Sequence, residues 1–188
     1  MSPLPVVVGI SGATGVLYGV ELLRALRRIG WPSHLVMTEM AGRTLALETD
    51  LRLDEVRSLA DVVYSVKNLA AAPASGSFRT QGMIVAPCSV KTLSGIANSF
   101  SQNLLLRAAD VTLKERRPLV LLFRETPLHQ GHLRLMMQAT EAGAILLPPM
   151  PAFYTRPQTV LDLVRQTVFR ALDLIGVVDD TVPRWEGA

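Results

Sequence analysis

The segment LPVVVGISGATG, residues 4–15, decides the fold that this sequence predicts. Residues 4–10 form a short apolar run, which is typical of a strand buried on both faces of a sheet. The glycine-rich turn SGATG follows, and the apolar spacing of residues 16–29 predicts a helix that ends at Gly30. A buried strand that leads through such a turn into a helix indicates the start of an α/β domain.

The same alternation continues along the rest of the chain. Further strands are predicted at residues 33–38, 61–66, 82–87, 118–123 and 144–148. Further helices are predicted at residues 39–48, 53–60, 89–98, 103–116, 130–142 and 158–176, with irregular loops at 70–78 and 149–157. We therefore expect a Rossmann-like (flavodoxin-like) α/β fold with three layers and a mostly parallel sheet, in a single domain of residues 1–188.

The composition narrows the class of protein further. Hydrophobic residues make up 49% of the chain, which indicates a packed globular protein, and no apolar stretch is long and unbroken enough to cross a membrane. The net charge of +3 is small, and no basic run is interleaved with aromatic residues, which argues against nucleic acid as a partner. The single cysteine excludes an internal disulfide framework and favours a reducing, cytoplasmic location.

Polar side chains follow the predicted strands. Ligands of open parallel sheets bind beyond the carboxyl ends of the strands, and the residues found there are Ser11, Thr14, Thr38, Ser89, Arg124, Glu125 and Tyr154. Gly9, Gly12 and Gly15 give the first turn the spacing G-x-x-G-x-x-G, which favours a mononucleotide phosphate over a dinucleotide. An ordinary tight turn between strand and helix is the alternative.

The charged residues between 107 and 125 each have two interpretations. One polar stripe on the predicted helix spans roughly 80° and contains Arg107, Asp110, Lys114 and Arg117. This stripe is either a solvated face or part of an anion site. Arg124 and Glu125 end a buried strand, where an arginine can clamp a phosphate and a glutamate can move a proton. A mutual surface ion pair, which contributes little, is the alternative for these two residues.

Three further features are weighed. Cys88 has no histidine partner nearby in the sequence, so we interpret it as structural. His129 and His132 lack a third ligand, so no metal site is predicted. The last helix has a predicted core stripe that contains Val160, Val164, Val168, Ala171 and Ile175. Arg170 points about 160° away from the centre of this stripe, toward solvent or a neighbouring subunit.

Seven segments of the chain carry a resemblance to a known family. They are GISGATG, PASGSF, APCSVKTLSGIAN, NLLLRAADVTLKERRPLVLL, RETPLH, PPMPAFYTRPQT and the terminal PRW. Together they closely resemble the UbiX family of flavin prenyltransferases. The resemblance implies a metal-independent transfer of a dimethylallyl group from a phosphate ester to nitrogen 5 and carbon 6 of reduced FMN. It also implies a homo-oligomer, usually a dodecamer, whose product, prenylated FMN, serves UbiD-type decarboxylases.

The resemblance also assigns roles to individual residues. It implies that the flavin is contacted by Ser11, Gly12, Ala13, Thr14, Thr38, Ser89 and Arg124. It implies that dimethylallyl phosphate is held by Ser75, Arg107, Lys114, Arg124, Tyr154, Arg170 and Trp185. The implied catalytic residues are Glu125, Glu48, Lys114 and Tyr154.

The sequence departs from the family at two of its motifs. Thr14 stands where many relatives have serine, and Phe123 replaces a common proline before Arg124. One rival hypothesis is a flavin-dependent cysteine decarboxylase, which would need a catalytic His–Asn pair, and the sequence shows no such pair. The other is an FMN carrier or accessory subunit of an aromatic acid decarboxylase without transferase activity. The cationic residues Arg107, Lys114 and Arg124 argue for a second phosphate site, which a carrier would not need.

Overall fold

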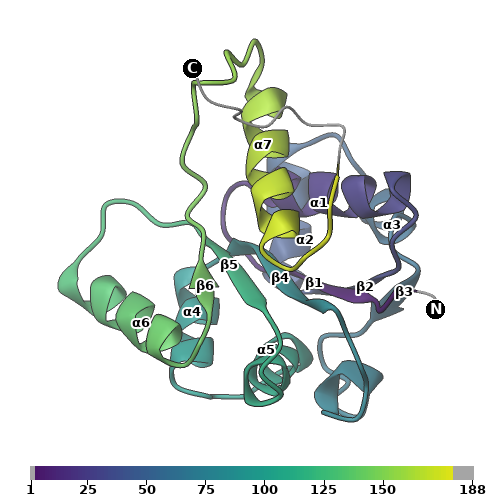
Figure 1. The fold of residues 1–188 in the computed structure, drawn as a ribbon, viewed down its shortest axis with the longest axis vertical. Helices are drawn as coiled ribbons and strands as arrows, with labels where there is room; N and C mark the ends of the chain where they lie inside the picture. Colours follow the sequence, from purple (N-terminus) through teal and green to yellow (C-terminus); the bar gives the residue numbers. More distant parts are fainter. Residues whose placement is uncertain (1–2, 180–188) are drawn as a thin grey trace.

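The computed structural model describes residues 3–179, which form a six-stranded sheet between two layers of helices (Figure 1). Every neighbouring pair of strands is parallel, and the strand order is β3-β2-β1-β4-β5-β6. The strands are β1 (Val6–Ile10), β2 (Ser33–Met37), β3 (Val62–Tyr64), β4 (Gly82–Cys88), β5 (Leu119–Phe123) and β6 (Ile145–Leu146). This is the order of doubly wound nucleotide-binding sheets, in which the ligand crevice lies beyond β1 and β4.

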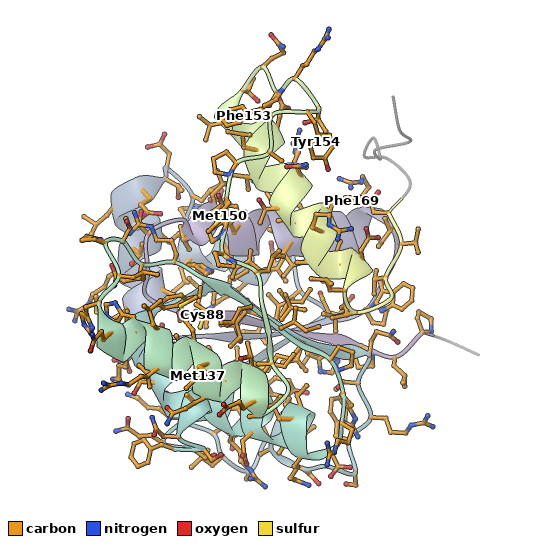
Figure 2. The ribbon with its side chains drawn as sticks, turned by 60° about the vertical axis from the view of Figure 1, so that its left-hand side comes forward. Cys88, Met137, Met150, Phe153, Tyr154 and Phe169 are labelled. Carbon is orange, nitrogen blue, oxygen red and sulfur yellow. The ribbon has the colours of Figure 1, made fainter. Side chains whose placement is uncertain are left out.

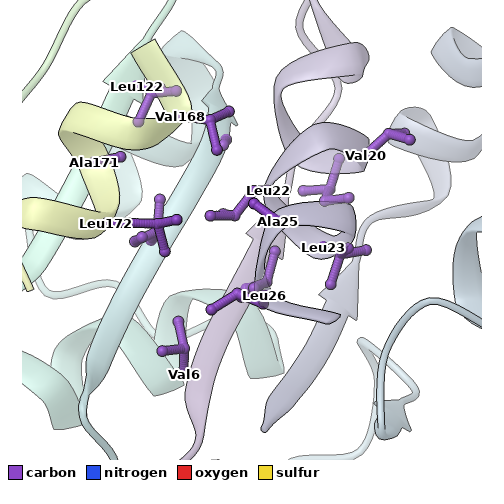
Figure 3. Packing of buried hydrophobic residues seen from close by; sticks show 14 of the residues in the cluster. Val6, Val20, Leu22, Leu23, Ala25, Leu26, Leu122, Val168, Ala171 and Leu172 are labelled. Carbon is purple, nitrogen blue, oxygen red and sulfur yellow. The ribbon is translucent and has the colours of Figure 1, made fainter. Parts of the chain in front are cut away.

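Helices cover both faces of the sheet (Figure 1). They are α1 (Val16–Arg28), α2 (Glu39–Glu48), α3 (Leu53–Arg57), α4 (Val90–Ala97), α5 (Leu104–Lys114), α6 (Gln130–Glu141) and α7 (Val160–Asp173). One buried cluster joins the sheet to α1 and α7, as Figure 3 shows, and a second joins it to α4, α5 and α6. The predicted three-layer α/β fold is thus confirmed.

The predicted elements are all present, with boundaries that differ by a few residues. Two details were wrong. Residues 70–78 were expected to be irregular but contain a short 3₁₀ helix, η1 (Ala72–Ala74). Val160 was assigned to the core stripe of the last helix, but it is 74% exposed because it is the first residue of α7. The other four residues of that stripe are buried, so the orientation of α7 was predicted correctly.

A buried glutamate links the two helices on the first face of the sheet. The Glu21 side chain in α1 is 4% exposed and accepts hydrogen bonds from Arg24 at 2.7 Å and from Arg165 of α7 at 2.9 Å. Burial alone would raise the pKa of the Glu21 carboxyl, but the two arginines outweigh it and hold the pKa below its usual range. Glu21 therefore stabilises the packing of α1 on α7 in its ionised form.

A partly buried histidine, His34, packs against aromatic rings near the β3 edge of the sheet. His34 in β2 lies against the rings of Tyr64 and Phe78, and its Nδ1 is 3.0 Å from the Tyr64 hydroxyl. Burial lowers the pKa of His34, and the nearby Asp61 carboxylate opposes this shift. The folded chain therefore favours the neutral imidazole.

None of the helices within residues 3–179 combines the length and the apolar character that crossing a bilayer requires.

Candidate functional site

The carboxyl ends of β1 and β4 are joined by the side chain of Ser11. Its hydroxyl donates to the carbonyl oxygen of Pro87 at 2.8 Å and accepts from the amide of Ser89 at 2.8 Å. Ser11 is fully buried, although it was predicted to contact the flavin. We therefore assign the Ser11 side chain to positioning, because its hydroxyl holds together the two strand ends that frame the crevice.

The turn between β1 and α1 is covered by α2. Gly15 adopts a left-handed conformation with φ of 89°, which favours glycine, and it is the N-cap of α1. The amides of Gly15 and Val16 both donate to Oε2 of Glu48, at 2.9 and 3.1 Å. A Cβ added to Gly12 would lie 2.4 Å from Cβ of Met40, so the first turn of α2 closely approaches the same turn. Glu48, predicted as a catalytic residue, thus caps α1.

Two further hydroxyls begin helices at the same edge. Thr38 is the N-cap of α2, and its Oγ1 accepts from the Ala41 amide at 3.1 Å. Ser89 is the N-cap of α4, and its Oγ accepts from the Thr92 amide at 3.3 Å and donates to the Thr92 hydroxyl at 3.1 Å. The first turn of α4 contains no acidic residue. Because helix N-termini attract anions, α4 offers a site for a phosphate.

Arg124 and Glu125 follow β5 at this edge and do not pair with each other. Glu125 Oε1 instead accepts from the Thr126 amide at 2.9 Å, and the backbone amide of Arg124 donates to the Cys88 carbonyl oxygen at 3.0 Å. The mutual surface ion pair considered from the sequence is therefore absent from residues 3–179. Both side chains are half-buried, which leaves a cation and a carboxylate next to the N-terminus of α4.

Tyr18 is a further candidate for the site, and it was not among the residues predicted from the sequence. It lies in the first turn of α1 and packs against Gly15. Burial raises the pKa of the Tyr18 phenol, and the positive charge of Arg124 opposes that shift, which brings the two side chains into one electrostatic environment. A large polar aromatic residue one turn after a glycine-rich segment was the available signal.

Two arginines of the predicted polar stripe hold the loop that contains Ser75: Arg107 lies in α5, and Arg117 follows the end of that helix. Arg107 donates to the carbonyl oxygen of Ala74 at 3.2 Å and pairs with Asp110 at 2.7 Å. Arg117 donates to two carbonyl oxygens of the loop, those of Gly76 and Phe78, each at 2.7 Å. The stripe is therefore more than a solvated face, since it binds the 72–78 loop to α5.

Lys114 and Ser75 complete this region. Lys114 forms an ion pair with Glu115, and both side chains lie close to Gly76. Ser75 is exposed, and its hydroxyl is 2.9 Å from that of Ser77. These two predicted donor-binding residues thus belong to one surface, at the C-terminal end of α5.

Within one chain, Lys114 and Arg170 lie toward the opposite edge of the sheet from Arg124. The amide of Leu104 at the start of α5 donates to the Val66 carbonyl oxygen beyond β3, so α5 starts at the carboxyl edge and ends with Lys114 toward the amino ends of the strands. Five residues of β5 separate the two edges by about 17 Å. Arg170 is also near the amino edge, because Gln81, just before β4, donates to the Ile175 carbonyl oxygen at 2.8 Å. Lys114 and Arg170 therefore lie apart from Arg124 within one chain, and their role in holding the donor phosphate stays a prediction.

The remaining predicted residues lie at the periphery. Tyr154 is 52% exposed on the loop between β6 and α7, next to the 71% exposed Phe153, and Figure 2 shows both far from Cys88. Arg170 is exposed as predicted and pairs with Asp173 at 3.2 Å. Trp185 lies outside the described residues. Tyr154 and Arg170 are thus both exposed on the surface of the single chain.

The other candidate groups do not enter this site. Cys88 is fully buried, and burial raises the pKa of its thiol, which supports the structural interpretation. The rings of His129 and His132 stack with centroids 3.6 Å apart, and Nδ1 of His129 accepts from the Gly131 amide to cap α6. His129 therefore has a structural role at the start of α6.

The fold, together with the polar residues at the carboxyl ends of its strands, defines a class of α/β protein. Proteins of this class bind a mononucleotide beyond the carboxyl ends of β1 and β4. A family model described as flavoprotein matches residues 1–165. The chain is 57% identical over 182 residues to flavin prenyltransferase UbiX of Thauera aromatica, covering 97% of this chain and 94% of that protein.

Two solved structures share this fold closely. A crystal structure of AnUbiX (PadA1) in complex with FMN and dimethylallyl pyrophosphate has a TM-score of 0.96 and 48% identity, and the match covers 99% of both chains. A dodecameric FMN-dependent Ubix-like decarboxylase from Escherichia coli O157:H7 has a TM-score of 0.94 and 47% identity over 98% of this chain and all of that one. The chain belongs to the UbiX family of flavin prenyltransferases.

Proposed function

We propose that this chain transfers a dimethylallyl group from dimethylallyl phosphate to nitrogen 5 and carbon 6 of reduced FMN. The product, prenylated FMN, is the cofactor that UbiD-type decarboxylases receive. The observation that carries the proposal is the unpaired arrangement of Arg124 and Glu125 at the end of β5, beside the N-terminus of α4. An arginine and a carboxylate that do not neutralise each other remain available to a phosphate and to a proton.

The flavin side of the site is formed by the turn after β1 and the helices that begin beyond β2 and β4. We propose that Thr38, Ser89 and Arg124 hold FMN, with the backbone of Gly12, Ala13 and Thr14 along its edge. Ser11 positions this arrangement through the Pro87 and Ser89 backbone. FMN fits here because the first turn of α4 has no acid of its own, and Arg124 donates its backbone amide to Cys88, the residue before the Ser89 N-cap of that helix.

The donor side requires more than one chain. We propose that the phosphate is held by Arg124 of one chain together with residues of neighbouring copies, from the cations Arg107, Lys114 and Arg170 and the hydroxyl of Tyr154, with Ser75 and Trp185 along the pocket. The separation of about 17 Å between the two edges of β5 supports this arrangement. The dodecameric relative supports it as well, so we propose a homo-oligomer of the same kind.

The residues of the chain supply charge stabilisation and proton transfer. When the allylic carbon–oxygen bond breaks, negative charge grows on the leaving phosphate, and fixed arginine and lysine side chains stabilise it without a metal. Glu125 removes the proton during ring closure, which contributes roughly 10²–10⁴-fold to the rate. Oε2 of Glu48 is engaged by the turn, which leaves Oε1 for an assisting role.

The cellular setting is part of the proposal. We propose a cytoplasmic protein of one domain, residues 1–188, since the single cysteine is a buried free thiol and both helical layers pack on one sheet. Its partners are dimethylallyl phosphate and a UbiD-type decarboxylase.

The test is anaerobic incubation with reduced FMN and dimethylallyl monophosphate, followed by mass spectrometry of the extracted flavin. The expected result is a flavin that is heavier by one five-carbon unit, and the diphosphate is tried as a second donor. Arg124→Gln is expected to abolish the mass gain, whereas the matched control Arg27→Gln, in the last turn of α1, retains it. Unmodified FMN with both donors would favour the carrier hypothesis instead.

A further inference from the structure

Both ends of α2 contact the turn between β1 and α1. At its C-terminal end, Glu48 accepts hydrogen bonds from Gly15 and Val16, residues that precede it by 33 and 32 positions. At its N-terminal end, Met40 lies so close to Gly12 that a Cβ at this glycine would be 2.4 Å away. The helix therefore lies along the whole turn and closes it from one side.

The amides that Glu48 occupies have a known use in this type of sheet. In doubly wound sheets with this strand order, the N-terminus of the first helix binds the pyrophosphate of a dinucleotide through its backbone amides. The first turn of α1 contains no acidic residue, so Glu48 brings an anion from another helix to the place a pyrophosphate would take. A second anion at this place would lose the amides and would be repelled by the carboxylate.

We infer that Glu48 is a specificity-determining residue that excludes pyrophosphate-containing dinucleotides such as FAD and leaves the edge to the single phosphate of FMN. Met40 contributes by preventing a closer approach to Gly12. The N-terminus of α4, which carries no acid in its first turn, stays open to one phosphate. The inference rests on the proposed function, because it concerns the flavin site of the same reaction.

Equilibrium binding of oxidised FMN and FAD, measured by flavin fluorescence, tests the inference without prenyl transfer. The variants are Glu48→Ala, which empties the amides, and Glu48→Gln, which removes the charge and keeps an acceptor. We expect FAD affinity to rise by about tenfold in the alanine variant and by less in the glutamine variant, while FMN affinity changes by less than about threefold. The matched control is Asp54→Asn, an acid on α3 whose side chain is 91% exposed.

The ratio of the two affinities separates the outcomes. A purely structural loss would weaken FMN and FAD alike and leave the ratio unchanged in both variants, which overturns the inference. Circular dichroism shows whether each variant folds. If the alanine variant does not fold, the ratio of FAD to FMN affinity in the glutamine variant tests the inference. A wild-type chain that binds neither flavin would overturn the proposed function together with the inference. A wild-type chain that binds FMN, with no gain of FAD affinity in either variant, would overturn the inference alone.

Discussion

Replacement of Ser11 by alanine removes one oxygen atom from the junction between β1 and β4. The hydroxyl donates to the Pro87 carbonyl oxygen and accepts from the Ser89 amide, and the residue is fully buried. The Pro87 oxygen still accepts from the Ser11 amide at 3.2 Å after the change, so the main loss is at the Ser89 amide. A buried amide left unsatisfied costs about 1–3 kcal/mol, and we expect a loss of about 2 kcal/mol.

The assay is thermal unfolding of wild type and variant at the same protein concentration, because a homo-oligomer unfolds in a concentration-dependent way. For a chain of this size, about 2 kcal/mol lowers Tm by about 4–8 °C. Thr14→Ala is the matched stability control, because it removes an exposed hydroxyl from the same turn and should change stability by less than about 0.5 kcal/mol. If Ser11→Ala lowered Tm by less than about 1 °C, the positioning role derived from these two hydrogen bonds would be refuted.

Four other predictions follow from the described contacts. Gly19→Ala would place a Cβ 2.4 Å from the carbonyl oxygen of Ala86, so we expect a loss of about 1–3 kcal/mol, and an unchanged Tm would contradict the close packing of α1 on β4. Glu21→Gln should cost about 1–2 kcal/mol at neutral pH, because the ionised carboxylate accepts from two arginines. Since the folded pKa of Glu21 is lowered, this contribution is present above about pH 4.5 and is lost as the pH falls through the folded pKa; melts of both proteins across this range measure it. The folded pKa of His34 is also lowered, so the unfolded chain takes up its proton first and stability falls below about pH 6.5; a ring pKa at or above that value in an NMR titration would be evidence against it. The Glu125→Gln variant should bind FMN as the wild type does but accumulate flavin whose fourth ring is not closed. Formation of the closed-ring product at the wild-type rate would contradict the proton-transfer role of Glu125.

The strands were predictable because each is a short apolar run bounded by turn residues. β4 and β5 are buried along their whole length, which is why their residues read as continuous hydrophobic segments. The last helix was harder to delimit. Its apolar spacing extends to Val160, but Val160 is the first residue of α7 and is exposed.

The site was predictable where it depends on the strand ends and unpredictable where it depends on helix packing. Parallel strands place their carboxyl ends at one edge, so Ser89 and Arg124 had to lie at the same edge as the β1 turn. Tyr18 was missed because its approach to Arg124 depends on how α1 crosses β4. Lys114 lies apart from Arg124 within one chain because α5 runs back toward the amino edge before β5 begins.

By itself, the sequence determined the alternation of strands and helices, the parallel sheet and the set of polar residues at its carboxyl edge. These features follow from local apolar spacing and from the geometry that parallel strands share. The tertiary structure alone decided that the buried Ser11 hydroxyl joins the ends of β1 and β4 and that Glu48 caps α1 from 33 positions away. Such contacts depend on the angle and distance at which helices pack on the sheet, and no local pattern in the chain encodes them.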